Sequence, residues 1–194
     1  MRLINGWDSN YEASIYIWML FDYKGEKMDT GKLYFIKDAF YDKFKYCGLL
    51  ENKEMVNGTL HGRPCCYMFK YKEDGLYWMI PVSSKIQKYQ NQYQRSISKY
   101  GLCDNISFGY VLGQRRAFLP QNLFPVTKEY IGNIYRDVNT NNPITIPRSL
   151  MAELNGKARK KIRYNFQGKK FGMTDIVKIY NLSLIHISEP TRPY

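Results

Sequence analysis

The sequence predicts an α+β fold built on a small, strongly bent antiparallel sheet. Two pairs of strand-forming runs are each joined by a short glycine-containing turn, and the helical patterns fall between and after these pairs instead of alternating with single strands. The chain has 194 residues, of which 44% are hydrophobic and 16% aromatic. That is enough for one sizeable core and too short for two ordinary domains.

The first elements are a strand over residues 32–36, rich in strand formers, and a helix over 38–46, where Phe40, Tyr41 and Phe44 recur at helical offsets. Residues 63–71 and 76–82 then flank Asp74-Gly75, a strong hairpin signal. Ser83 and Ser84 end this hairpin and have the chemistry to cap a helix over 85–98.

A second antiparallel pair is predicted at residues 107–112 and 116–119, turning through Gly113 and Gln114. Helices fit residues 127–138 and 148–164, with Pro147 close to the start of the second. The polar run 139–143 between them reads as a loop.

The sequences at the two ends of the chain do not look like native protein sequence. Residues 182–192 spell LSLIHISEPTR, which matches the translation of a transposase adapter used in sequencing libraries. Lys24 to Lys27, before Met28, spell what a purine-rich ribosome-binding site gives when read in frame. We therefore expect residues 1–27 to be translated leader, 28–181 to be a single domain, and 182–194 to be adapter translation. The alternative at the first end is a genuine N-terminal extension.

The charge balance points to a polyanionic partner. Lys and Arg number 29 against 17 Asp and Glu, a formal net charge of +12, so RNA, DNA and anionic membranes are all candidates. Because no apolar run approaches the length of a membrane span, we expect no membrane partner. The four cysteines lack CxxC spacing, and Cys65 and Cys66 should point to opposite faces of one strand. We read them as reduced thiols of a cytoplasmic protein.

Two regions could carry chemistry. Ser83-Ser84-Lys85 ends a strand and opens a helix, so hydroxyls, free backbone N–H groups and a cation converge where a phosphate could bind. His61 and Arg63 precede the partner strand and could meet that phosphate from across the sheet end. A plain helix cap and ordinary surface residues are the alternatives.

The second region is a basic band on the predicted helix 148–164, with Tyr164 and Phe166 beyond it available for base stacking. Such a run is usually a solvated helix face, but the net charge favours nucleic acid. The band consists of Lys157, Arg159, Lys160, Lys161 and Arg163.

No carboxylate pair, glycine-rich nucleotide loop or Ser/His/Asp arrangement stands out. With only one histidine before the suspect C-terminal tail, we expect neither a metal site nor a cofactor. RNA cleavage needs none of these, because the 2′-OH is an internal nucleophile that requires only deprotonation, charge stabilisation at phosphorus and protonation of the leaving oxygen.

The order of KLYFIKDAFYDKF, HGRPCCYMFK, YWMIPVSSKIQKY and SFGYVLGQRRAFL resembles the ToxN and AbiQ superfamily of type III toxins, closest to its CptN branch. The resemblance implies an SH3-like barrel of the Kid and MazF kind with peripheral helices. It also implies a bacterial phage-defence endoribonuclease that leaves a 2′,3′-cyclic phosphate without metal. The implied partners are cellular mRNA and an inhibitory antitoxin RNA, a pseudoknot cut from tandem repeats, held in a closed protein–RNA oligomer.

Carried onto this sequence, the resemblance places the paired hydroxyls at Ser83 and Ser84, the lysine at Lys85 or Lys88, and the strand-opening base at Arg63. An aromatic residue near the site falls at Phe40 or Tyr41. His61 has no counterpart in the ToxN branch.

These assignments give a mechanism. Ser84, helped by Ser83, positions or deprotonates the 2′-OH, Lys85 and Arg63 stabilise the phosphorane, and His61 protonates the leaving 5′ oxygen. The alternatives are a non-catalytic toxin of the same barrel fold that inhibits a protein, and a plain RNA-binding module.

Overall fold

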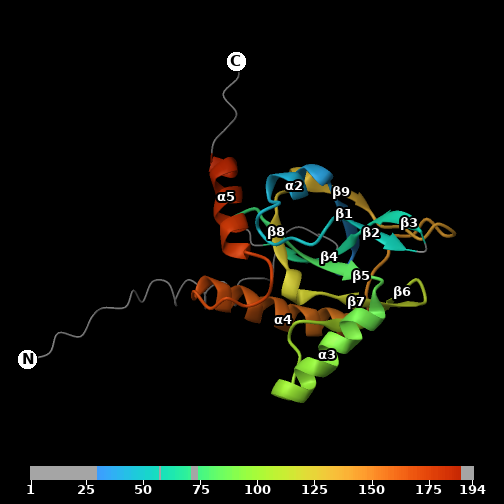
Figure 1. Ribbon diagram of the computed structural model, residues 1–194. Coiled ribbons are helices and arrows are strands. Elements are labelled where there is room, and N and C mark those ends of the chain that lie inside the picture. Colours follow the sequence, from blue (N-terminus) through green and yellow to red (C-terminus); the bar gives the residue numbers. More distant parts are fainter. Residues whose placement is uncertain (1–29, 57, 71–73, 189–194) are drawn as a thin grey trace, which may run out of the picture.

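A seven-stranded antiparallel sheet forms the centre of the computed structural model, which describes residues 30–56, 58–70 and 74–188 (Figure 1). The strand order is β6-β7-β5-β4-β1-β9, with β8 against β5. The strands are β1 (Leu33–Ile36), β4 (Pro64–Lys70), β5 (Tyr77–Ser83), β6 (Ser107–Val111), β7 (Gln114–Phe118), β8 (Phe124–Val126) and β9 (Ile131–Ile134). No helix in the described part of the chain is long and apolar enough to cross a membrane.

The sheet bends around β5, which belongs to both of its halves. Along most of its length β5 pairs with β4, whereas its other edge pairs with β8 at Tyr77–Met79 and with β7 at Val82 and Ser83. Within the described residues β6 and β9 are the ends of the strand order and do not pair with each other, so the sheet stays open. The α+β class and the bent sheet are thus confirmed, as a sheet that stops short of a closed barrel.

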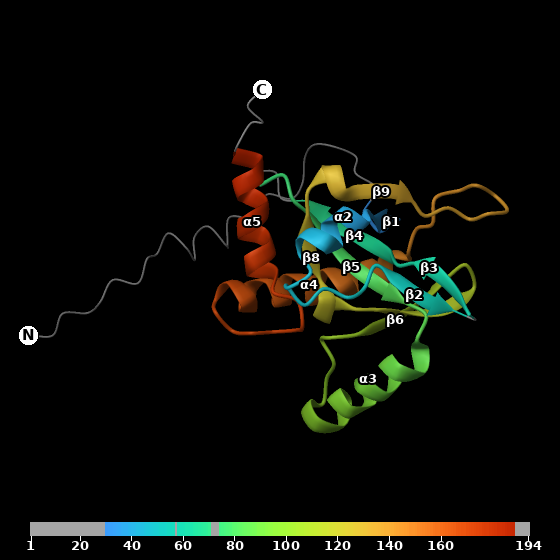
Figure 2. The same ribbon diagram turned by 45° about the horizontal axis from the view of Figure 1, so that its top comes forward.

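Helices cover both faces of the sheet (Figures 1 and 2). Helix α4 (Arg148–Phe166) buries Leu150, Leu154 and Ala158 in the core cluster that holds Trp78 and Ile80. Helix α2 (Asp38–Lys43), with the turn after it, buries two phenylalanines in the cluster on the opposite face. Helices α3 (Ile86–Tyr100) and α5 (Ile176–Ser188) flank the sheet, and 3₁₀ turns occupy Pro120–Asn122 and Lys128–Tyr130.

Strand alternation places neighbouring cysteines as predicted. Cys65 belongs to the core cluster beside α2, whereas Cys66 belongs to the cluster beside α4. All four cysteines are buried and free. Burial raises the pKa of the Cys65 thiol to about 12, so this thiol stays protonated at neutral pH.

One predicted helix is wrong. Residues 127–138 form a 3₁₀ turn and strand β9, because the open edge of β1 offers backbone groups to this segment. The amide of Tyr135 donates to the Leu33 carbonyl at 2.7 Å and that of Lys37 to the Tyr130 carbonyl at 2.9 Å. Pairing with β1 therefore outweighs the helical spacing of the apolar residues. Gly132 allows the pairing because it has no side chain to clash with the backbone of β1.

A short hairpin, which the sequence prediction left as a polar stretch, lies beside the end of β5. Among the described strands, β2 (Lys53–Val56) and β3 (Thr59–Gly62) pair with each other and not with the main sheet. Glu54 stands opposite His61 in the register, so the two side chains share one face.

Of the two suspect ends, residues 1–27 and 189–194 lie outside the described residues. Residues 182–188 form the last two turns of α5, in which Ser183 is buried and Ile185 is 53% exposed. The predicted domain boundaries stay predictions.

Candidate active site

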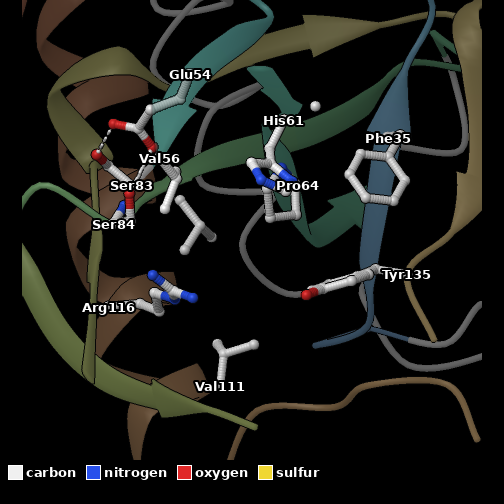
Figure 3. Close-up of a pocket in the computed structure, with 12 residues that line it drawn as sticks. Phe35, Glu54, Val56, His61, Pro64, Ser83, Ser84, Val111, Arg116 and Tyr135 are labelled. Atoms are coloured by element: carbon white, nitrogen blue, oxygen red, sulfur yellow. Dashed lines mark hydrogen bonds between the residues drawn. The ribbon is translucent and has the colours of Figure 1, made fainter. Parts of the chain in front are cut away.

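A cavity of about 280 Å³ opens between the β2–β3 hairpin and the end of β5 (Figure 3). Glu54, Ser83, Ser84 and Arg116 lie on one side of it, Phe35 and Tyr135 lie on the other, and His61 lies beside Pro64 between them (Figure 3). The polar residues are Glu54, His61, Ser83, Ser84 and Arg116, and the others are Phe35, Val56, Gly62, Pro64, Val82, Val111 and Tyr135. The predicted junction of Ser83 and Ser84 therefore does face a pocket, which a plain helix cap does not require.

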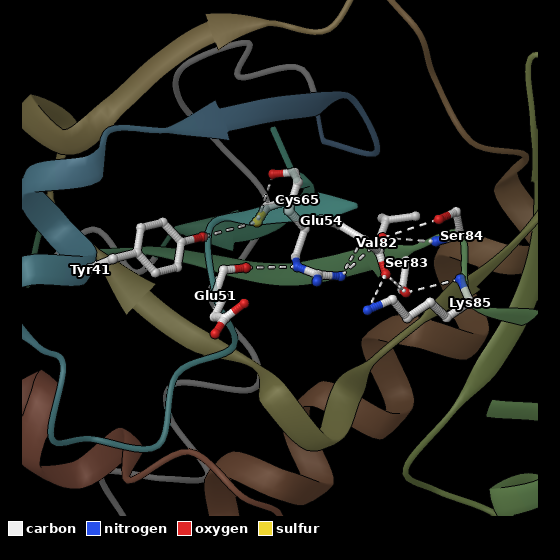
Figure 4. Close-up of polar contacts among 9 residues, drawn as sticks. Tyr41, Glu51, Glu54, Cys65, Val82, Ser83, Ser84 and Lys85 are labelled. Atoms are coloured by element: carbon white, nitrogen blue, oxygen red, sulfur yellow. Dashed lines mark hydrogen bonds and ion pairs between the residues drawn. The ribbon is translucent and has the colours of Figure 1, made fainter. Parts of the chain in front are cut away.

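Glu54 is the centre of the polar side. The carboxylate is 6% exposed and accepts hydrogen bonds from Ser83 Oγ at 2.7 Å, Ser84 Oγ at 3.2 Å and the Ser84 amide at 3.1 Å (Figure 4). Ser83 Oγ in turn accepts from the Lys85 amide at 3.2 Å, at the start of α3. The two serines thus point their hydroxyl hydrogens at one buried carboxylate.

Arg63 holds Glu54 from behind. Its guanidinium lies 3.5 Å from the carboxylate and also donates to the Val82 carbonyl at 3.2 Å and the Glu51 carbonyl at 2.9 Å. Arg63, predicted to contact the scissile phosphate, is 5% exposed and does not line the cavity, so its guanidinium faces Glu54 and not the open space of the cavity. Its role is to position Glu54 and the end of β5.

The electrostatic balance keeps Glu54 ionised. Burial raises the pKa of this carboxyl, but the Ser83 hydrogen bond, the Arg63 charge and the Ser84 bonds outweigh burial and leave the pKa below its ordinary value. Lys85 adds a further cation, with Nζ 3.9 Å from Glu54 and a half-exposed side chain. A buried carboxylate whose pKa is shifted by specific partners, and which lines a cavity, is a candidate functional group.

Two further cationic or titratable groups face the cavity. His61 is exposed on β3, directly opposite Glu54 in the hairpin register. Arg116, on β7, points its guanidinium into the hollow from the side of Ser84 (Figure 3). Sequence reasoning missed both Glu54 and Arg116.

The aromatic residues expected near the site lie elsewhere. Phe40 is fully buried in the core with Phe44 and Phe124, so its predicted RNA contact is wrong in this structure. Tyr41 is half-buried, and its hydroxyl lies 3.9 Å from Cys65 Sγ, away from Ser83 and Ser84 (Figure 4). Burial and the nearby thiol raise the pKa of Tyr41 well above its usual range.

The predicted basic band is largely occupied by contacts within the protein. Lys157 donates to the Ile106 carbonyl at 2.9 Å and pairs with Glu153, and Lys160 pairs with Asp104. Lys161 is fully buried and donates to the Gln121 carbonyl, so it has no surface to offer a phosphate.

Other residues predicted to contact RNA are at least partly exposed. Arg159 is partly exposed over the Phe69 ring, Arg163 is exposed, and Lys88 is exposed on α3. Their contacts with RNA stay predictions.

The comparisons with known proteins come from structure alone. No protein-family model and no curated protein matches the sequence. The fold is similar to that of AbiQ, a lactococcal anti-phage endoribonuclease of a type III toxin–antitoxin system, with a TM-score of 0.61, 11% identity, and coverage of 82% of this chain and 99% of AbiQ.

A second similar structure comes from a bacterial antiviral system that a processed non-coding RNA regulates. Here the TM-score is 0.57 at 12% identity, over 78% of this chain and 96% of the other. The chain therefore has the AbiQ fold, as the sequence resemblance predicted.

Proposed function

We propose that this protein is a metal-independent endoribonuclease, the toxin of a type III toxin–antitoxin system. The observation that supports this most is the convergence of Glu54, Ser84, His61 and Arg116 on one cavity. These side chains supply a proton acceptor, a proton donor and a cation, which is all that attack by an internal 2′-OH requires. The likeness to AbiQ, an endoribonuclease, supports the same reaction.

Proton removal falls to Ser84 and Glu54 together. A serine is a poor base on its own, but Ser84 Oγ already donates to Glu54 Oε2 at 3.2 Å, which leaves its lone pairs free to accept from a 2′-OH. The 2′-OH proton passes to Ser84 as the Ser84 proton passes to Glu54. The 2′ oxygen then forms a bond to phosphorus.

Arg116, which lines the cavity, stabilises the charge on the phosphorane. Lys85 does not line the cavity, but its half-exposed side chain lies 3.9 Å from Glu54 and reaches the phosphate from the rim. The bond from phosphorus to the 5′ oxygen breaks as His61 gives that oxygen a proton. The products are a 2′,3′-cyclic phosphate and a free 5′-OH. Ser83 and Arg63 do not touch the reacting atoms and act by holding Glu54.

The proposed partners are a cellular mRNA as substrate and a repeat-derived antitoxin RNA as inhibitor, assembled in a closed protein–RNA oligomer. The net charge of +12 suits either RNA. The similar antiviral system regulated by a processed non-coding RNA supports RNA as the regulator.

Single-turnover cleavage of a labelled RNA, with chelator present throughout, tests the proposal. Wild type should cut, whereas Ser84→Ala and Lys85→Ala should each be slower by on the order of a hundredfold or more with RNA affinity changed far less. In His61→Ala the basic limb of the pH–rate profile should vanish. A wild type that chelator stops, or two variants that cut at full rate, would show that the proposed chemistry is wrong. Binding without any cutting would favour an RNA-binding module, and toxicity without RNA contact a protein target.

A further inference from the structure

Facing the proposed catalytic side chains, the cavity has a second wall made of rings. Phe35 of β1 and Tyr135, just after β9, lie with ring centroids 5.3 Å apart and ring planes at 64°. Both are half-buried and line the same hollow as Ser84 and Arg116 (Figure 3). Pro64, Val56 and Val111 complete an apolar surface. A phosphate alone has no use for such a surface.

The backbone is arranged to place these rings. Gly62 lies directly beneath Phe35, and a Cβ at that position would come within 3.2 Å of the ring. The Tyr135 amide is fixed by the Leu33 carbonyl at 2.7 Å, so β1 and β9 hold both rings in register. Tyr135 points its hydroxyl edge into the hollow, toward Arg116 on the other side (Figure 3).

From this two-walled cavity we infer that Phe35 and Tyr135 form the binding site for one unstacked RNA base next to the scissile phosphate. The inference rests on the proposed function for its phosphate side. Proteins recognise single-stranded RNA by stacking splayed bases on aromatic rings, and a cavity of about 280 Å³ suits one nucleotide and not a duplex.

Tyr135 and Phe35 would then select the substrate base, whereas Ser84, Glu54 and His61 would transfer the protons. Loss of one base–aromatic stack weakens binding by about 5- to 150-fold. Tyr135→Leu should lose this amount, whereas Tyr135→Phe, which keeps the ring, should lose little. Tyr46→Leu is the matched control, since Tyr46 is 82% exposed and does not line the cavity.

The first measurement is the fluorescence of 2-aminopurine, an adenine analogue whose emission falls on stacking, placed singly in a short single-stranded RNA. The protein carries Ser84→Ala so that the RNA stays intact. Emission should fall on binding, and the fall should disappear with Tyr135→Leu added but persist with Tyr46→Leu or Tyr135→Phe added. Equal quenching in all four proteins, or none in any, would overturn the inference.

The second measurement pairs the protein with the substrate in a double-mutant cycle. An RNA with a mapped cleavage site receives an abasic nucleotide on one side of that site or the other. Wild type should cut one abasic RNA about 5- to 150-fold more slowly than the intact RNA, whereas Tyr135→Leu should cut that abasic RNA and the intact RNA at similar rates. Independent, multiplying effects would overturn the inference. Quenching without any cleavage would leave the base site standing and remove the proposed function.

Discussion

At the scale of single residues, Glu54 changes the account of the site most. The sequence placed two serines at a strand-to-helix junction but offered no base to activate them. In the structure both hydroxyls donate to Glu54, and Arg63, expected at the phosphate, turns behind Glu54 instead. The two serines, which the sequence alone allows to be a plain helix cap, thus share one buried carboxylate that could accept a proton.

Glu54→Gln should therefore slow cleavage by on the order of a hundredfold or more, because an amide cannot accept the proton. Glu153→Gln is the matched control, since Glu153 also accepts from a serine hydroxyl, that of Ser107 at 2.7 Å, and from a lysine, but lies on α4 outside the cavity. Single-turnover rates measure the effect, and thermal unfolding checks that both variants fold. Equal rates in the two variants would remove Glu54 from the mechanism.

Lys161 gives a second prediction at this scale. Burial lowers the pKa of this ammonium to about 7, against 10.5 when exposed. Between these values the unfolded chain binds the proton and the folded chain does not, so this group makes the free energy of unfolding rise with pH, by at most about 1.4 kcal/mol per pH unit.

Urea unfolding from pH 6.5 to 8.5 measures that slope, and Lys161→Met should remove the contribution. The Gln121 carbonyl would keep its bond from the Met173 amide at 3.0 Å, so the variant leaves no unpaired group there. The same slope in both proteins would mean that Lys161 does not titrate in this range.

At the scale of elements, the sequence predicted those whose local pattern and tertiary environment agree. The β4–β5 hairpin, helix α3 and helix α4 all lie within about two residues of their expected bounds. The β2–β3 hairpin was missed because its strands are largely exposed and carry no continuous apolar face. Since that hairpin holds Glu54, the carboxylate to which both serine hydroxyls donate could not be found from the sequence.

Strand β9 was misread for the opposite reason, because its apolar spacing fits a helix while its partner edge on β1 is invisible in the sequence. A substitution at Gly132 distinguishes a helix from a strand in this segment. In a helix Gly132→Ala would stabilise, but a Cβ here meets the Phe35 carbonyl oxygen at 2.9 Å, so the variant should lose about 1–3 kcal/mol.

Gly156→Ala serves as the control in α4, where a Cβ meets nothing within 4 Å, and it should gain about 0.5–1 kcal/mol. Chemical denaturation of both variants gives the comparison. If Gly132→Ala stabilised the protein, the result would support the predicted helix in this segment and contradict strand β9.

At the scale of the whole molecule, the net charge is +12, but only some of the basic side chains are exposed and able to contact RNA. Much of the basic band on α4 is used for internal contacts, whereas Lys85, just before α3, Lys88 on α3 and Arg115 on β7 keep exposed side chains. We expect these three to contact RNA phosphates.

Replacing Lys85, Lys88 and Arg115 together by Ala should flatten the slope of log K against log salt for single-stranded RNA by roughly 2. Lys45, Lys169 and Lys170, also exposed but on other elements, form the control triple. Binding titrations at several salt concentrations measure the slopes, and a slope changed only by the control triple would place the RNA on another face.

In the proposed reaction the RNA's own 2′-OH is the nucleophile, and no metal ion is needed. This reaction is tested most directly by an RNA with one 2′-deoxy nucleotide at the mapped cleavage site, incubated with wild type and chelator. The all-RNA substrate should be cut to a 2′,3′-cyclic phosphate and a 5′-OH, and the single 2′-deoxy change should abolish the cut at that position. Cutting of the 2′-deoxy substrate, or products ending in a 5′-phosphate, would contradict the proposed reaction.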